Sequence, residues 1–180
     1  MTLSLLALLL GALIIAPALF ALTRPEGFVA QARRFPRSRP WGFVLVPLAT
    51  AWFLYYLSLE TISDFAAFKP YMYVGFALLG ALTCIYVQDF LAVRGLALVL
   101  MLLGKLMIDT ALWADTAWRL VIIVWAYLII CAGMWLTVSP WRLRDLIDWA
   151  TAEPARLRAL MIARLGLGLF VAVLGLTAFR

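Results

Sequence analysis

Six long apolar runs constrain this sequence more than any other feature. They cover residues 3–22, 41–59, 71–87, 96–112, 120–138 and 160–179. Each has about 17 to 20 residues, enough for a helix to cross the roughly 30 Å hydrocarbon core of a bilayer at 1.5 Å per residue. The sequence therefore predicts an all-α, polytopic membrane protein with about six transmembrane helices in a bundle. We expect a single transmembrane domain over residues 1–180, with candidate hairpin units at 1–60, 71–112 and 119–180.

Composition favours the same class and argues against several others. Hydrophobic residues make up 67% of the chain and charged residues only 13%, whereas a soluble domain is about half apolar and a quarter charged. The sequence contains no histidine, and Cys84 and Cys131 lie inside apolar runs. It thus lacks the commonest metal ligand and the commonest general base near neutral pH. We expect no metal, no cofactor and no enzymatic activity.

The distribution of basic residues predicts the orientation in the membrane. The loops after the first, third and fifth runs hold ten arginines: Arg24, Arg33, Arg34, Arg37, Arg39, Arg94, Arg142, Arg144, Arg156 and Arg158. The other side receives Lys69, Arg119 and Arg180 with three acids, Glu60, Asp64 and Asp115. Because basic loops stay in the cytoplasm, both termini should lie outside it. We therefore expect anionic lipid headgroups to balance the net charge of +6, and we expect no nucleic-acid partner.

The fifth loop contains an amphipathic segment from Trp141 to Trp149. Its apolar residues fall on one helical face and its charged residues on another, which predicts a helix along the cytoplasmic surface. Pro140 suits its start and Pro154 its end, and Arg144 and Asp148 have the spacing of an ion pair. The residues predicted to meet headgroups at this membrane surface are Arg33, Arg34, Arg37, Arg39, Trp141, Arg142, Arg144 and Trp149.

Lys105 and Asp109 are the strongest candidates for intramembrane chemistry. They are four residues apart in the fourth run, on one helical face, and Lys105 falls near the middle of that run. Charges there are costly, so the pair should face the bundle or a polar cavity. It is either a proton or ion relay or a neutralised pair that fixes helix packing, and we favour packing because no second titratable pair accompanies it.

Other polar and small residues have weaker interpretations. Asp115 and Arg119 have the spacing of an interfacial ion pair. Three pairs of small residues have a spacing that allows two helices to approach closely: Ala77 and Ala81, Gly80 and Cys84, and Gly168 and Ala172.

The first and last hairpins share a layout. Each has a helix that ends in Leu-Thr, a proline, a basic stretch with aromatic residues, and a second proline followed by two arginines. A duplicated hairpin would explain this echo, but we favour chance similarity between lipid-facing compositions.

From about Arg119 to its end, the chain resembles the YjeT-like family of small two-helix bacterial inner-membrane proteins, whose function is not established. The matching elements are Gly133, Pro140-Trp141, Pro154, Leu157-Arg158, Arg164, Gly166 and Gly168. The interval from Pro154 to Arg164 is about one helical turn longer than in that family. The resemblance implies a bacterial inner-membrane hairpin and no chemistry.

Two classes of function are compatible with these features. The first is an accessory or scaffold protein of the inner (cytoplasmic) membrane, without catalytic activity, whose partners are anionic lipid and other membrane proteins or a second copy of the chain. The alternative is a small transporter or channel that uses Lys105 and Asp109. A polar cavity that reaches this pair would favour transport.

Overall fold

The computed structural model describes residues 2–61 and 66–179, and all regular structure in these two stretches is helical. The helices are α1 (Leu3–Thr23), α2 (Pro25–Arg34), η1 (Phe35–Arg37), α3 (Arg39–Leu59), α5 (Lys69–Tyr86), α6 (Leu91–Ala111), α7 (Arg119–Val138), α8 (Trp141–Ala150) and α9 (Pro154–Thr177). In these described stretches, five helices, α1, α3, α6, α7 and α9, are long and apolar enough to cross a membrane. The chain is a multi-pass membrane protein.

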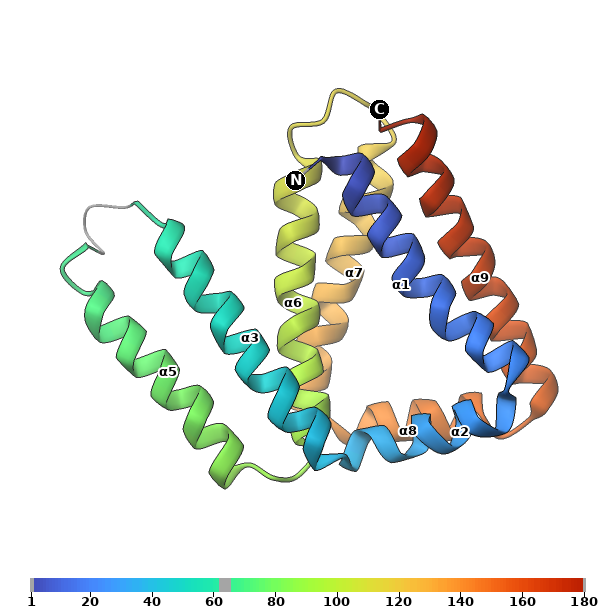
Figure 1. Cartoon of the computed structure of the whole chain (residues 1–180), viewed down its shortest axis with the longest axis horizontal. Coiled ribbons are helices and arrows are strands. Elements are labelled where there is room, and N and C mark those ends of the chain that lie inside the picture. Colours follow the sequence, from blue (N-terminus) through green and yellow to red (C-terminus); the bar gives the residue numbers. More distant parts are fainter. Residues whose placement is uncertain (1, 62–65, 180) are drawn as a thin grey trace.

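The third predicted span is a helix, α5, but it is not among these five. It has 18 residues and begins with the polar pair Lys69-Pro70. Its first residue is close to the end of α3, because the ammonium of Lys69 donates a hydrogen bond to the carbonyl of Ser58 at 3.3 Å. Near its other end, Cys84 is buried with Val46 of α3 and Leu91 of α6. Helix α5 therefore runs antiparallel to α3 (Figure 1), and its membrane crossing stays a prediction.

Prolines mark the start of several helices. Pro25, Pro40, Pro70 and Pro154 each occupy the first turn of a helix, where the missing N–H has no helical partner to lose. Two of these helices include residues outside the predicted apolar runs. Residues 25–34 form α2 rather than a loop, and Pro154, which was expected to end a surface helix, begins α9. Both segments are rich in charged residues, so hydropathy alone does not reveal that they are helical.

The long helices are arranged as packed pairs (Figure 1). Helix α1 packs against α9, α6 packs against α7, and α3 joins α6 on one side and α5 on the other. The first and last predicted hairpin units thus share one bundle, because α1 packs mainly on α9. Helices α2 and α8 cross the opposite end from the two termini (Figure 1). We call the end with α2 and α8 the basal end, and the end with the termini the terminal end.

The core lies where α1, α6, α7 and α9 meet. Leu6, Met107, Ile122 and Val171, one from each helix, are at most 2% exposed. Helices α1 and α9 approach closely at Gly11, where an added Cβ would lie 2.9 Å from both the Ala172 Cβ and the Gly168 carbonyl oxygen. Any side chain at Gly11 would force the two backbones apart. The predicted close approach at Gly168 and Ala172 is confirmed, with α1 as the partner helix.

Candidate functional site

Lys105 and Asp109 form the ion pair that their spacing predicts. The Lys105 Nζ donates to the Asp109 Oδ2 at 2.7 Å, and it lies 4.7 Å from the centre of the Tyr56 ring on α3. Both charged side chains are 46% exposed. Helix α6 begins at Leu91, five residues before the predicted run, so Lys105 is nearer the terminal end than expected. It lies about 9 Å from the last residue of the helix.

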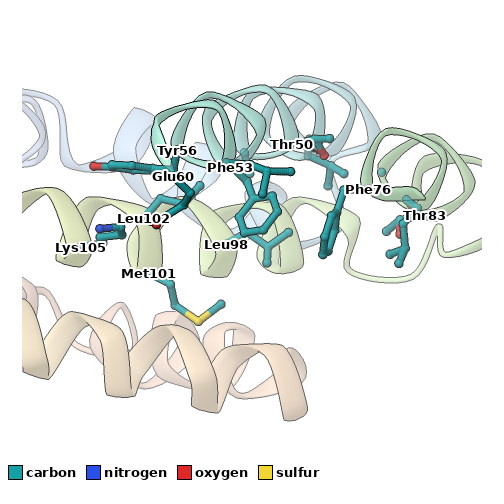
Figure 2. Close-up of a pocket in the computed structure, with 15 residues that line it drawn as sticks. Thr50, Phe53, Tyr56, Glu60, Phe76, Thr83, Leu98, Met101, Leu102 and Lys105 are labelled. Atoms are coloured by element: carbon teal, nitrogen blue, oxygen red, sulfur yellow. Dashed lines mark hydrogen bonds between the residues drawn. The ribbon is translucent and has the colours of Figure 1, made fainter. Parts of the chain in front are cut away.

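Lys105 also lines a groove of about 560 Å³ between α3, α5 and α6. Figure 2 shows how these side chains lie. The lining of the groove comes from all three helices and consists of Val46, Ala49, Thr50, Phe53, Tyr56, Leu57, Glu60, Phe76, Leu79, Gly80, Thr83, Leu98, Met101, Leu102 and Lys105. These residues are far apart in the sequence, so no sequence motif predicts the groove.

The two ends of the groove differ in polarity. Tyr56, Glu60 and Lys105 lie at one end, whereas Thr50 and Thr83 lie toward the other (Figure 2). Both threonine hydroxyls donate to carbonyls of their own helices, at 2.9 Å for Thr50 and 2.7 Å for Thr83. Each hydroxyl thereby uses its one donor on its own helix. The charged side chains of the lining, Lys105 and Glu60, are together at one end, and the rest of the lining is mostly apolar.

A second polar surface covers the basal end. Helices α2 and α8 lie against each other there, and Arg33 of α2 joins them. Its Nε donates to the Thr151 Oγ1 at 3.1 Å and lies 3.6 Å from the Asp148 Oδ1. The apolar side chains Phe28 and Val29 of α2 pack against the lower part of α1 and α9. We call the outer surface of α2, η1 and α8 the basal platform.

The predicted headgroup residues are gathered on this platform, except Arg39, which is beside it as the first residue of α3. Arg33, Arg34, Arg37, Arg39 and Arg142 are exposed, and Arg144 is half-buried. Trp141 and Trp149, at the start and near the end of α8, are also exposed. The structure thus brings together the arginines of two loops that are about a hundred residues apart, as their shared side of the membrane predicts.

Two predicted ion pairs are wrong. Arg144 pairs with its neighbour Asp145 at 3.0 Å, and Arg33 approaches the predicted partner, Asp148. Arg119 donates instead to the carbonyls of Leu112 and Ala114, at 3.1 and 2.8 Å. These carbonyls lie just after the end of α6, where backbone carbonyls have no hydrogen-bond partner within the helix. The spacing of four residues thus pointed to two arginines that make polar contacts, but it did not predict the groups that accept their hydrogen bonds.

No family model, curated protein or solved structure matches this chain. The resemblance of residues 119–180 to a two-helix family stays a prediction. Among residues 2–61 and 66–179, no three Cys, Asp or Glu side chains come together as a metal site would require. Sequence reasoning missed Tyr56 and Glu60, which join Lys105 only through the packing of α3 on α6.

Proposed function

We propose that this protein is a non-catalytic membrane scaffold whose basal platform holds anionic lipid and membrane partners. The observation that carries the proposal is the pairing of α2 with α8 through Arg33. Two amphipathic helices from distant parts of the chain are held together there, and their arginines are presented outward. A surface of this kind attracts anionic headgroups by about 1 kcal/mol per basic residue.

The proposal includes an orientation. The platform lies on the cytoplasmic side of the inner membrane, as the arginine bias favours. Six helices cross the bilayer, and both termini are outside the cytoplasm. The antiparallel course of α5 beside α3 supports the sixth crossing. Reporter fusions after Arg39 and after Glu153 should report the cytoplasm, and one after Leu59 should report the opposite side. Opposite results from the first two fusions would refute the six-helix orientation.

Lipid recruitment tests the platform directly. The full chain is reconstituted in phosphatidylcholine vesicles that contain a minor fraction of fluorescent phosphatidylglycerol, and its enrichment around the protein is measured. Arg34→Gln/Arg37→Gln/Arg142→Gln should lower the apparent affinity by roughly fivefold per arginine. The charge-retaining variant Arg34→Lys/Arg37→Lys/Arg142→Lys should keep most of it. Equal enrichment by both variants would remove the electrostatic basis of the platform.

Partner binding is tested by cross-linking in native membranes. A photoreactive amino acid at Leu146, an exposed position of α8, should give one or a few discrete products with other membrane proteins or with a second copy. The matched position is Leu128, an exposed residue of α7, where lipid is the expected neighbour. A diffuse pattern that is the same at both positions would argue against a scaffold.

A small transporter or channel is the alternative. Lys105 is half-exposed and lines a groove, which is the observation in its favour. The lining of that groove is mostly apolar, and the ammonium is already bonded to Asp109, which favours a structural pair. Vesicles that contain the protein should show no more K⁺, Na⁺ or proton flux than empty vesicles. A flux that disappears in Lys105→Gln/Asp109→Asn would replace the scaffold proposal with transport.

A further inference from the structure

The groove between α3, α5 and α6 has the length of one lipid leaflet. Along α3, its lining extends from Val46 to Leu57, which is about 16 Å at the rise of an α-helix, and the charged Glu60 follows at the mouth. Half of a roughly 30 Å hydrocarbon core is about 15 Å. The groove crosses the middle of α3, and its polar end, at Tyr56, Glu60 and Lys105, is toward the terminal end. Its length therefore matches an acyl chain of a lipid whose headgroup is on that side.

The groove has room for an acyl chain. It holds about 560 Å³, and a polymethylene chain is narrow, because its width is set by carbon contacts of about 4 Å. A helix with its side chains is about 10 to 12 Å across and is a far bulkier occupant. Lipid labelling and cross-linking to a partner distinguish the two.

The polarity of the groove matches an amphiphile. Apolar side chains such as Phe53, Leu98 and Leu102 line its length, and Lys105, Tyr56 and Glu60 lie together at the terminal end. Lys105 has three N–H donors and uses one on Asp109. With 46% of its side chain exposed, it can donate a charge-assisted hydrogen bond to a phosphate oxygen. The adjacent Glu60 is exposed and can accept from an amine or a hydroxyl.

We propose that this groove binds one membrane phospholipid, with an acyl chain along Phe53, Leu98 and Leu102 and its phosphate at Lys105. The site is at the opposite end from the basal platform and does not depend on the scaffold role. In this site, Asp109 holds the ammonium of Lys105 at the mouth, and Tyr56 flanks it. The ion pair thereby positions a headgroup contact.

The experiment uses the full chain in phospholipid vesicles with two photoreactive probes. One is a phosphatidylethanolamine with a diazirine in its acyl chain, and the other is a diacylglycerol with the same chain and no phosphate. After illumination, labelled peptides are mapped. The phospholipid probe should label the groove residues of α3 and α6 about tenfold more than the lipid-facing surface of α7 around Leu128, because a charge-assisted hydrogen bond is retained only in the groove.

Two variants separate the chain contact from the headgroup contact. Leu98→Trp fills the groove and should abolish its excess labelling, whereas Leu128→Trp adds the same bulk to an exposed face and should not. Lys105→Gln/Asp109→Asn keeps the shapes and removes the charges. It should lower phospholipid labelling of the groove several-fold and leave diacylglycerol labelling unchanged.

Several outcomes overturn the proposal. Equal labelling of the groove and of α7 would mean that the groove has no bound lipid. Equal loss of both probes in Lys105→Gln/Asp109→Asn would exclude the phosphate contact. If the groove is protected from both probes and a cysteine at Leu57 cross-links to another polypeptide, its occupant is a partner helix or a second copy. If Leu98→Trp fails to fold, the labelling contrast in the charge-free variant still decides the matter.

Discussion

The four helices α1, α6, α7 and α9 share a core of covered side chains, whereas α3 and α5 extend from one side of α6. In the four-helix core, small residues such as Gly11 and Ala7 let backbones approach closely. In the α3–α5 flank, Cys84 is the buried residue of α5, and large side chains such as Phe53 and Phe76 meet across a groove. Lipid tails are as apolar as leucine, so close packing is what holds membrane helices together. Close approach is not confined to the core, because a Cβ added at Gly95 of α6 would lie 2.7 Å from the Leu45 Cβ of α3. The flank differs in that α3 and α5 bury few side chains, which leaves more of their surface for lipid or partners.

The largest effect should come from adding bulk at a tight backbone contact of the core. Gly11→Val places a side chain against the Gly168 carbonyl and should cost about 1–3 kcal/mol of unfolding free energy. Gly75→Val on α5 meets nothing within 4 Å and should change it by less than about 0.5 kcal/mol. Denaturant titration in detergent micelles measures both. Equal losses would mean that the loss at Gly11 does not come from its contact with α9.

A smaller and local effect is expected at the contact between α3 and α5. The rings of Phe53 and Phe76 have centroids 4.6 Å apart, and such a pair is worth about 0.5–1.5 kcal/mol beyond its buried area. Phe76→Ala should speed amide hydrogen exchange in α5 and leave exchange in α1 and α9 unchanged. Leu82→Ala, at an exposed position of the same helix, is the control. Faster exchange throughout the bundle would show that flank and core unfold as one unit.

The sequence predicted the membrane helices better than their partners. The runs 3–22 and 120–138 differ by one residue at an end from α1 and α7, because hydropathy measures what must be removed from water. Helix α2 and the first turns of α9 were missed, since they are rich in charged residues and hydropathy does not detect such helices. Hydropathy also carries no information on pairing, so the contact of α1 with α9 was not foreseen. The Gly168–Ala172 spacing was the one signal for it.

The candidate site was predicted in part for the same physical reason. Lys105 and Asp109 lie on one helix, where a spacing of four fixes their geometry. Tyr56 and the groove depend on how three helices pack, which no local pattern specifies. Asp148 has a suitable neighbour in Arg144, but Arg33, far away in the sequence, approaches it instead. Interactions within a helix follow from sequence spacing, and interactions between helices do not.

The platform link should contribute less than either helix contact. Arg33→Ala removes the bond to Thr151 and the approach to Asp148, but both charged side chains are about half exposed. Exposed pairs contribute about 0–1 kcal/mol, and we expect a loss in the lower part of this range. Arg34→Ala, on the same helix, is the matched control and removes a charge without these contacts. High salt should reduce the difference between the two variants. A loss above about 2 kcal/mol would make the platform part of the core.

The smallest effect is expected at the ion pair between Lys105 and Asp109. Each side chain is 46% exposed and lies toward the terminal end of α6, so either can extend toward the interface instead of remaining in hydrocarbon. Lys105→Met alone leaves Asp109 without its partner and should destabilise the bundle more than the double change does. Lys105→Met/Asp109→Leu removes both desolvation costs and should be neutral or slightly stabilising. Unfolding in micelles compares the two variants with the parent. If the double variant loses more stability than Lys105→Met, the pair is a net contributor to packing between α6 and α3, and the flank is held to the core by charge as well as by shape.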